Sequence, residues 1–177
     1  MHHHSLEELY QLHHERVFNL ALHYVQQVED AEEITQDVFV KVHEKLHTFQ
    51  GLSEAGTWIY RITINTALDY LRARKANKRA FWLRVVSIHE KKPEQEAQTL
   101  NHPGIQLEHK EALQRLLRAI NKLPERQRSA LILLKMEGLS TEEAARIMEL
   151  TPKALESLFQ RAKAQLKILL EQSKEHE

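Results

Sequence analysis

The chain of 177 residues has no cysteine, and it has only four glycines and four prolines. The lack of cysteine excludes disulfide bonds, a thiolate nucleophile and zinc bound by cysteine. No stretch approaches the roughly 20 apolar residues of a membrane-spanning helix, so we expect no direct membrane insertion. The N-terminal residues MHHHSLEELY lack the apolar core of a secretory signal peptide. Together these absences favour a cytoplasmic protein.

The scarcity of glycine and proline also bears on the fold, because these two residues form many turns. Hydrophobic residues make up 42% of the chain, which is enough for a core. The rest of the composition is rich in Leu, Ala, Glu, Gln, Lys and Arg, the residues that favour helices. We therefore predict an all-α fold, arranged as one domain or as two small ones.

The stretch from residue 57 to residue 80 combines an apolar side, a polar stripe and a basic tail. Apolar residues recur at helical spacing and should bury one face of a helix, namely Trp58, Ile59, Ile62, Ala67, Leu68 and Leu71. A second face carries, three or four residues apart, Arg61, Asn65, Asp69 and Arg72. The tail adds Arg74, Lys75, Lys78 and Arg79. Such a helix suits a phosphate backbone and base edges, but the charge alone also fits a solvated helix end whose cations complement the helix dipole.

Two helices are expected before this stretch, and the first of them covers residues 5–26. Its start is marked by Ser5 with Glu8 three residues later, the pattern of a capping box. The loop 47–56 separates the second helix from the basic one. Loops set between rigid helices are common positions for selective contacts.

The second helix is expected at residues 30–46, with Asp30 as its N-cap. This region is acidic, since residues 29–46 hold six acids and two lysines. Phe39 lies off the apolar stripe of the helix, and it is either a core residue or an anchor on a contact surface. An acidic helix followed by a basic one suggests two different partners or one intramolecular pairing.

Residues 84–105 break the helical pattern and divide the chain. They contain two prolines, a glycine and a polar run without a clear period. We interpret this segment as a linker between a first domain at residues 1–83 and a second domain at residues 106–177. The second domain should begin with a helix at residues 106–121.

The rest of the second domain is marked by helix-end signals. Pro124 suits the first position of a helix, and Gly138 suits its C-terminal cap. Ser140 then opens a short helix, and Thr151 caps a longer one that begins at Pro152. A short helix, a tight turn and a longer helix form the layout of a helix-turn-helix. On this pattern alone, an ordinary bundle of three or four helices is the alternative.

The two halves together resemble extracytoplasmic-function (ECF) sigma factors, the two-domain class of bacterial RNA polymerase initiation factors. In the first half, DAEEITQDVFVKVHEKLHTFQG and TWIYRITINTALDYLRAR resemble region two of that family. In the second half, the segment LPERQRSALILLKMEGLSTEEAARIMELTPKALESLFQRAKAQL resembles region four. The likeness covers roughly residues 7–80 and 110–170. Both regions in this order, with a linker between them, make a promoter-specificity factor the preferred interpretation.

The resemblance assigns a role to each helix. The acidic helix would dock on the clamp helices of the polymerase β′ subunit through Asp30, Glu33, Gln36, Asp37, Phe39 and Lys41. The basic helix would meet the −10 promoter element through Arg61, Asn65, Asp69, Arg72, Arg74, Lys75 and Lys78. The last helix would enter the major groove at the −35 element through Lys153, Ser157, Gln160, Arg161 and Lys163. The loop 47–56 would receive a base flipped out of the non-template strand.

Some positions need separate comment. Unstacked bases require a pocket or an aromatic platform, and Trp58, Tyr60 and Tyr70 are candidates, although aromatic residues at helical spacing more often pack in a core. Glu149 stands in the turn of the helix-turn-helix where glycine is usual, so a left-handed backbone there would cost about 1 kcal/mol. Glu156, in the last helix, would repel phosphate wherever it faces the groove.

The resemblance also implies the partners, which are core RNA polymerase, promoter DNA and an anti-sigma factor. It implies no cofactor and no catalytic residue, because nucleotide chemistry would belong to the polymerase. A helix-turn-helix regulator that binds DNA without polymerase is the alternative function. His43 and His47 lie four residues apart, a spacing that can bind a divalent metal, but no third ligand is evident. We therefore predict neither a metal site nor an enzyme.

Overall fold

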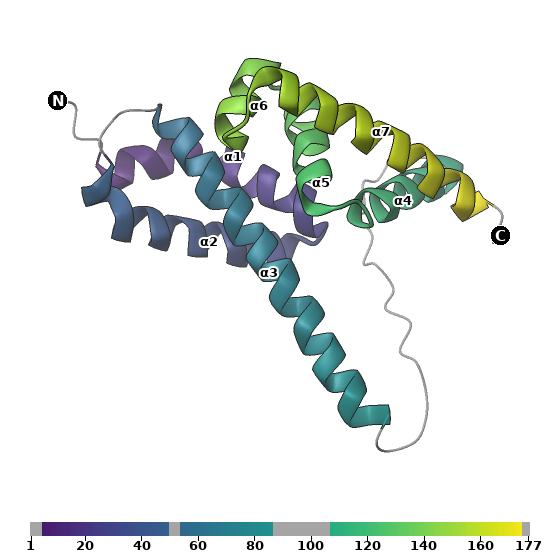
Figure 1. The fold of residues 1–177 in the computed structure, drawn as a ribbon. Coiled ribbons are helices and arrows are strands. Elements are labelled where there is room, and N and C mark those ends of the chain that lie inside the picture. The colour runs from purple at the N-terminus through teal and green to yellow at the C-terminus, as the bar shows by residue number, and fades with distance from the viewer. Residues whose placement is uncertain (1–4, 50–53, 87–106, 175–177) are drawn as a thin grey trace.

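The computed structural model describes residues 5–49, 54–86 and 107–174 (Figure 1). Every regular element within these ranges is helical, which confirms the all-α prediction. In chain order the elements are α1 (Leu6–Val25), α2 (Val28–Lys45), the 3-10 turn η1 (Leu46–Thr48), α3 (Ala55–Val86), α4 (Leu107–Asn121), α5 (Glu125–Leu131), the π-helical turn η2 (Ile132–Met136), α6 (Thr141–Met148) and α7 (Pro152–Lys174). None of these described helices is long and apolar enough to cross a bilayer.

The first module, α1 to α3, is a bundle in which each helix packs against the other two. Ile34, Val38 and Val42 repeat every four residues along α2, and all three are fully buried, as their spacing predicted. Leu20 of α1 and Ile59 of α3 meet the same cluster. The three apolar stripes therefore close on one another, which is how an amphipathic helix is stabilised in a small domain.

The N-terminal caps of α1 and α2 differ. The Ser5 hydroxyl accepts a hydrogen bond from the Glu8 amide at 3.1 Å, and the Glu8 carboxylate accepts one from the Ser5 amide at 3.0 Å. The predicted capping box is thus confirmed. The prediction of Asp30 as N-cap is wrong, because α2 begins at Val28 and Asp30 lies within its first turn. Acids favour every position of a first turn, so acidity alone did not identify the capping residue.

Helix α3 is longer than the basic stretch that predicted it. It begins at Ala55 and continues to Val86, and its C-terminal part projects beyond the bundle (Figure 1). The predicted boundary at residue 83 falls inside this helix. Most of the predicted linker lies outside the described residues, so the domain limits 1–83, 84–105 and 106–177 stay predictions.

The second module contains α4 to α7. Helices α4, α5 and α6 all pack against α7, which contributes Leu155 to the cluster shared with the first module and Phe159 to a second, smaller cluster. Pro124 immediately precedes α5 instead of opening it, one residue from its predicted place. This helix is not uniform, since it widens into the π-helical turn η2 before Gly138.

The helix-turn-helix is formed by α6 and α7, as predicted. Ser140 and Glu143 form a second capping box, with the Ser140 amide donating to the Glu143 carboxylate at 2.9 Å. The Thr151 hydroxyl accepts a hydrogen bond from the Ala154 amide at 3.2 Å and so caps α7. Gly138 has a φ of 67° and ends the preceding helix in the left-handed region, where glycine has no steric penalty.

Glu149, the residue between α6 and α7, has a left-handed backbone with φ 54° and ψ 48°. This is the conformation for which the sequence predicted a cost. Its side chain is 73% exposed and pairs with Arg61 of the first module. The strained residue thus lies in the turn that connects the two helices of the motif.

Replacing Glu149 by glycine and by alanine separates the backbone strain from the ion pair. Both substitutions remove the carboxylate, but only glycine removes the Cβ that makes a left-handed conformation costly. We expect Glu149→Gly to be more stable than Glu149→Ala by about 1 kcal/mol, measured by chemical denaturation. Equal stability of the two variants would show that the turn carries no strain.

Candidate nucleic-acid interface

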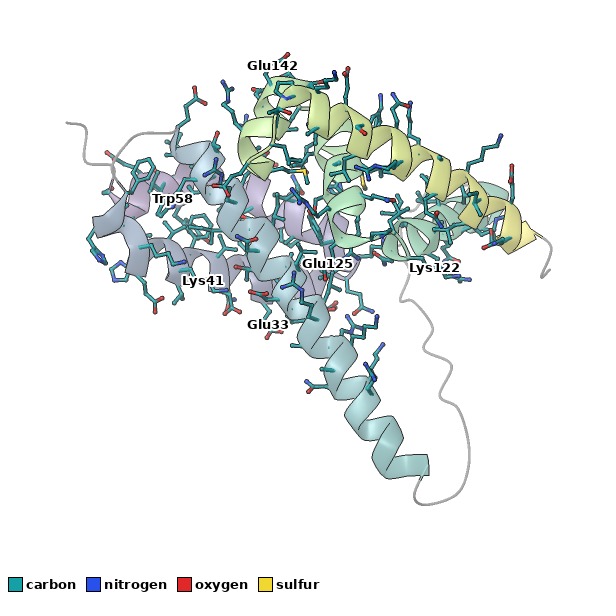
Figure 2. All side chains as sticks on the ribbon, viewed as in Figure 1. Glu33, Lys41, Trp58, Lys122, Glu125 and Glu142 are labelled. Carbon is teal, nitrogen blue, oxygen red and sulfur yellow. The ribbon has the colours of Figure 1, made fainter. Side chains whose placement is uncertain are left out.

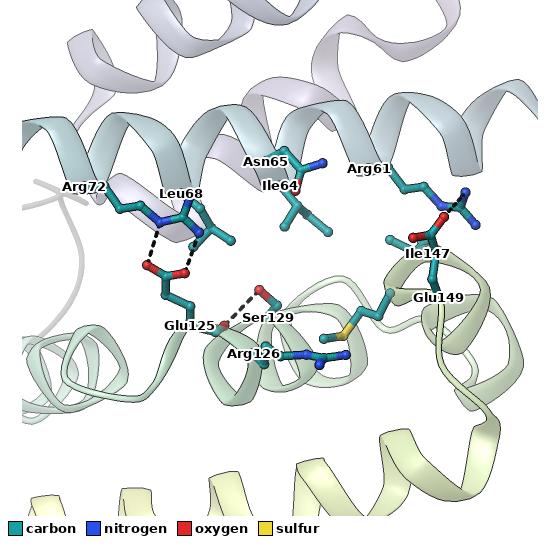
Figure 3. A pocket seen from close by; sticks show the side chains of 11 residues that line it. Arg61, Ile64, Asn65, Leu68, Arg72, Glu125, Arg126, Ser129, Ile147 and Glu149 are labelled. Atoms are coloured by element: carbon teal, nitrogen blue, oxygen red, sulfur yellow. Dashed lines mark hydrogen bonds and ion pairs between the residues drawn. The ribbon is translucent and has the colours of Figure 1, made fainter.

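The polar face of α3 lies against the second module. Arg61, Asn65 and Arg72 line one wall of a cavity of about 300 Å³ between α3 and the helices α5 and α6 (Figure 3). The opposite wall belongs to the second module and comprises Glu125, Arg126, Ser129, Ile147, Met148 and Glu149. The structure therefore places Arg61, Asn65 and Arg72, three of the residues predicted to meet the −10 element, on a face of α3. The module predicted to read the −35 element partly covers that face.

Two arginines of α3 are paired with glutamates across this cavity. Arg72 donates to both Glu125 carboxylate oxygens, at 3.0 and 2.6 Å. Its third hydrogen bond goes to Asp69 at 2.8 Å. Arg61 pairs with Glu149 at 2.8 Å and also donates to the backbone carbonyl of Arg146 at 2.6 Å. The hydrogen bonds from Arg72 lower the pKa of the Glu125 carboxyl, so Glu125 is ionised at neutral pH.

The other cations of α3 lie beyond the cavity. Arg74 forms an ion pair with Asp30, and it donates to the Gln27 side chain at 3.2 Å. Asp30 also accepts a hydrogen bond from the Tyr70 hydroxyl at 2.7 Å. Lys75 and Lys78 are exposed on the projecting part of α3. Arg74 and Asp30, which were assigned to DNA and to polymerase, thus bind each other and join α3 to α2.

The three aromatic candidates are half-buried, and each has a contact within the chain. The Trp58 ring (labelled in Figure 2) lies 4.9 Å from the ring of Phe49. The Tyr60 hydroxyl donates to Glu137 of the second module at 3.1 Å. Burial and the neighbouring Glu137 carboxylate raise the pKa of Tyr60 to about 12. Burial and the Asp30 carboxylate raise the pKa of Tyr70 to the same value, so both phenols stay protonated donors at neutral pH.

The candidate −35 face lies on α7, on the side of that helix that remains exposed. All five predicted residues are exposed there: Lys153, Ser157, Gln160, Arg161 and Lys163. Positions separated by three and four residues stack along one side of a helix, as Lys153, Ser157 and Gln160 do. Glu156 is exposed between them, so a negative charge stands on the same surface.

The acidic helix α2 presents only part of the predicted polymerase face. Glu33, Gln36 and Asp37 are exposed and lie on one side of the helix. The other three predicted residues are engaged within the module. Phe39 is only 7% exposed and packs edge-on against Tyr10, with the ring centres 4.7 Å apart. Lys41 donates to the Thr66 hydroxyl at 3.0 Å, and Asp30 binds Tyr70 and Arg74 as described above.

The sequence analysis missed a set of buried and part-buried polar contacts between the modules. The Tyr24 hydroxyl of α1 donates to the Ser129 hydroxyl of α5 at 2.7 Å. The Glu137 carboxylate accepts from Tyr60 with one oxygen and lies 2.9 Å from His23 Nδ1 with the other. These partners are 77 to 114 residues apart in sequence, so no local pattern could have paired them.

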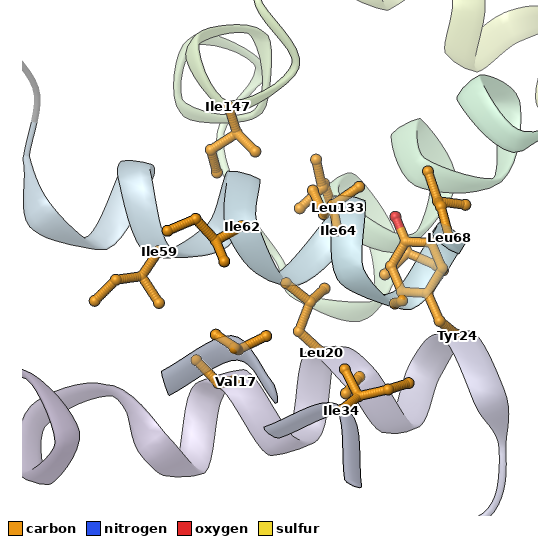
Figure 4. Packing of buried hydrophobic residues seen from close by; sticks show 14 of the residues in the cluster. Val17, Leu20, Tyr24, Ile34, Ile59, Ile62, Ile64, Leu68, Leu133 and Ile147 are labelled. Atoms are coloured by element: carbon orange, nitrogen blue, oxygen red, sulfur yellow. The ribbon is translucent and has the colours of Figure 1, made fainter. Parts of the chain in front are cut away.

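Apolar residues of both modules form one continuous cluster beside these contacts (Figure 4). Ile62 and Ile64 of α3 lie near Ile147 and Leu133 of the second module. Ile64 is 8% exposed although it lies outside the apolar stripe predicted for α3. The second module therefore buries a second side of this helix.

Within the residues that the structure describes, no group of three His, Asp or Glu side chains is arranged to hold a metal ion. His43 and His47 are both exposed near the end of α2. The chemistry available at the candidate interface is thus that of guanidinium, ammonium, amide and carboxylate groups. These are the groups that bind phosphates, base edges or one another.

Known protein families match both modules. The model for sigma-70 region 2 matches residues 9–77, and the model for sigma-70 region 4 matches residues 113–166. The ECF RNA polymerase sigma factor SigM of Mycobacterium tuberculosis is 28% identical over 166 residues, which is 94% of this chain and 77% of the relative. The ECF RNA polymerase sigma-E factor of Escherichia coli K12 is 32% identical over 120 residues, which is 68% of this chain and 63% of the relative.

Solved structures agree on the fold. CnrH in complex with the cytosolic domain of CnrY matches with a TM-score of 0.64 and 23% identity, over 94% of this chain and 87% of that one. The sigma factor RpoE of Bartonella quintana, in complex with the anti-sigma factor NepR, matches with a TM-score of 0.63 and 24% identity, over 93% and 96% of the two chains. The two family models and the named relatives favour a sigma factor over a polymerase-independent regulator. The chain belongs to the sigma-70 family, and it is an ECF sigma factor that functions in transcription initiation.

Proposed function

We propose that this chain binds core RNA polymerase and directs it to promoters, with α3 reading the −10 element and α7 reading the −35 element. The observation that carries the proposal is the exposed face of α7, where Lys153, Ser157 and Gln160 lie on one side of a helix-turn-helix that is capped at both of its helix starts. Cations on such a helix position the phosphate backbone, and amide or hydroxyl groups read base edges. Gln160 is the candidate for base reading, and Lys153 with Arg161 and Lys163 are the candidates for phosphate contacts.

The −10 element would be held by α3 through Arg61, Asn65, Asp69, Arg72, Arg74, Lys75 and Lys78. Lys75 and Lys78 are exposed already, whereas Arg61, Arg72 and Arg74 would exchange their carboxylate partners for phosphates. The polymerase would dock on the exposed side of α2 at Glu33, Gln36 and Asp37. Asp30, Phe39 and Lys41 would support that surface from within the module.

An anti-sigma factor is the further partner that we propose. The support is that RpoE of Bartonella quintana, which shares this fold, was solved with the anti-sigma factor NepR. In this role the chain acts in the cytoplasm and has no catalytic group of its own, because the polymerase performs the nucleotide chemistry.

The test is transcription by core RNA polymerase with and without the chain, on genomic DNA, followed by sequencing of transcript 5′ ends. We expect defined start sites that share −10 and −35 sequences and that depend on the chain. Asp37→Lys with Glu33→Lys should abolish these starts, because it reverses the charge of the proposed docking face. Glu15→Lys with Glu7→Lys, which makes the same charge change on exposed residues of α1, should retain them.

Two results would contradict the proposal. Core enzyme that gains no defined start sites with the chain would exclude a role as specificity factor. Sequence-specific binding of duplex DNA by the chain alone, without any effect on core enzyme, would instead identify an independent regulator.

A further inference from the structure

The contact between the modules places carboxylates where the −10 face would hold DNA phosphates. Arg72 grips Glu125 with two parallel hydrogen bonds of 3.0 and 2.6 Å. A guanidinium group uses the same two-pronged geometry for phosphate. At the other end of the cavity Arg61 makes a single contact of 2.8 Å with Glu149, and it donates a second hydrogen bond to the Arg146 carbonyl. A carboxylate and a phosphate cannot occupy the same guanidinium edge, so DNA must displace these glutamates.

Three glutamates of the second module bind polar side chains of α3. Glu125 opens α5, Glu137 follows η2, and Glu149 follows α6. They contact α3 at Arg72, Tyr60 and Arg61 respectively. Glu125 points toward α3 whereas Glu142 of the same module points away from it (Figure 2). Three glutamates of the second module are thus each paired with a different polar residue of α3.

An apolar contact between the modules lies beneath the ion pairs. Ile64 and Leu68 are 8% and 9% exposed, and they line the cavity opposite Ile147 and Met148. The buried hydrogen bond from Tyr24 to Ser129 lies in the same contact. An apolar centre with a polar, more exposed rim is the organisation of a specific interface. The rim pairs are partly exposed, since Arg72 retains 56% of its side-chain surface, so they can be exchanged for other anions.

The two DNA faces are treated differently by this contact. The face of α3 is partly covered, since Arg61 and Arg72 keep 34% and 56% of their side-chain surface but both pair with glutamates of the second module. The α7 residues Lys153, Ser157 and Gln160 are exposed. Duplex DNA can reach α7 without any movement of the modules. A strand that follows α3 past Arg61 and Arg72 requires the second module to move away.

We propose that the free chain inhibits itself: Glu125, Glu137 and Glu149 hold the second module on the −10 face of α3 in place of DNA, while the −35 face of α7 stays open. The inference rests on the proposed function for its meaning, but the closed contact can be tested separately. Only the fraction of molecules that is open would bind a strand on α3, so closure lowers the apparent affinity in proportion to that fraction. The chain would then bind single-stranded DNA poorly until something separates the modules.

The first measurement is closure itself. The chain has no cysteine, so Glu44→Cys on α2 and Ala154→Cys on α7, both exposed positions, can be labelled with a donor and an acceptor dye. We expect the transfer efficiency to fall when Glu125→Gln and Glu149→Gln are combined, because glutamine keeps the shape and removes the charge. The matched control is Glu142→Gln with Glu171→Gln, which removes two charges from the same module away from α3. It should leave the efficiency unchanged.

The second measurement is binding of a short oligothymidylate, a single strand without secondary structure. Glu125→Gln with Glu149→Gln should raise the affinity by about three- to tenfold, the range expected when two partly exposed ion pairs are removed. The control pair should change it by less, through net charge alone. Binding of a short duplex should respond equally in both variants. Raising the salt concentration should lower the transfer efficiency of the labelled chain that keeps all its glutamates at the contact, because exposed ion pairs are screened. This measurement does not depend on whether a glutamine variant folds.

The inference is overturned if neither glutamine variant changes the transfer efficiency, or if the two variants change the affinity for single strands equally. It is also overturned if the modules separate and the affinity for single strands stays the same. Its failure differs from failure of the proposed function. If only the inference fails, the chain still directs core polymerase to start sites. If the proposed function fails, no start sites form although the closed contact is real.

Discussion

Leu133→Ala should lower the free energy of unfolding by about 2–5 kcal/mol, the range for removal of a fully buried leucine side chain. Leu133 has no exposed surface, and it belongs to the cluster that joins both modules. The truncation would leave a cavity beneath Ile64 of α3, a neighbour in Figure 4, and the surrounding helices could fill it only in part. The loss of packing would therefore destabilise both the second module and its contact with the first. Denaturation by urea, followed by circular dichroism, measures the effect.

Leu113→Ala is the matched control for this prediction. The same atoms are removed, but Leu113 is 37% exposed on α4, and alanine is the better helix former. We expect a loss of about 1 kcal/mol or less. A similar loss for both variants would mean that the shared cluster does not form a packed core.

Lys153→Ala combined with Arg161→Ala should weaken binding of promoter duplex by roughly 10- to 150-fold for each phosphate interaction that the substitutions remove, on the basis of charge-assisted hydrogen bonds worth about 1.5–3 kcal/mol. Both side chains are exposed on α7. Each removed interaction should also lower the log–log salt slope by about 0.9, because fewer counterions are released. Titration of a labelled promoter duplex with the chain and core enzyme, at several salt concentrations, measures both quantities.

Lys167→Ala, with Lys163 left intact, is the control for the substitutions on α7. Lys167 is 79% exposed on the same helix, and it lies beside Glu171 at 3.9 Å, one turn further along. It should change neither the affinity nor the salt slope beyond the small effect of net charge. If the Lys167 variant weakened binding as much as the double variant, α7 would attract DNA only by its overall charge, and the assignment of its N-terminal half to the major groove would fail.

Local signals predicted the parts of this fold whose causes are local. The capping boxes at Ser5 and Ser140 and the cap at Thr151 each depend on residues within one turn, and all three were found in the structure. For Glu149 the sequence predicted only the cost of a left-handed backbone, and the structure shows that the residue adopts it. The acidic first turn of α2 shows the limit of such signals, because its cap was misplaced although its existence was predicted.

The sequence predicted which residues of α3 share a polar face, but it did not predict which residues of the second module lie against that face. The spacing of Arg61, Asn65 and Arg72 on one face follows from helical period alone. Their partners Glu125 and Glu149 come from the other module, and nothing in either stretch specifies that the two meet. Ile64 illustrates the same point, since periodicity identifies one apolar side of a helix and this helix is covered on two. The π-helical turn η2 was also missed.

The π-helical turn η2 fixes the direction in which the residues after it face. In η2 the Glu137 amide bonds to the Ile132 carbonyl, five residues back, at 2.9 Å, so the backbone accommodates one residue more than an α-helical turn would. Deletion of a single residue in this segment would restore an ordinary helix and rotate the chain beyond it by about 100°. Glu137 would then swing away from Tyr60 and His23, although no side chain at the contact had been altered. The spacing of the chain in η2, as much as its chemistry, sets which carboxylate faces the neighbouring module.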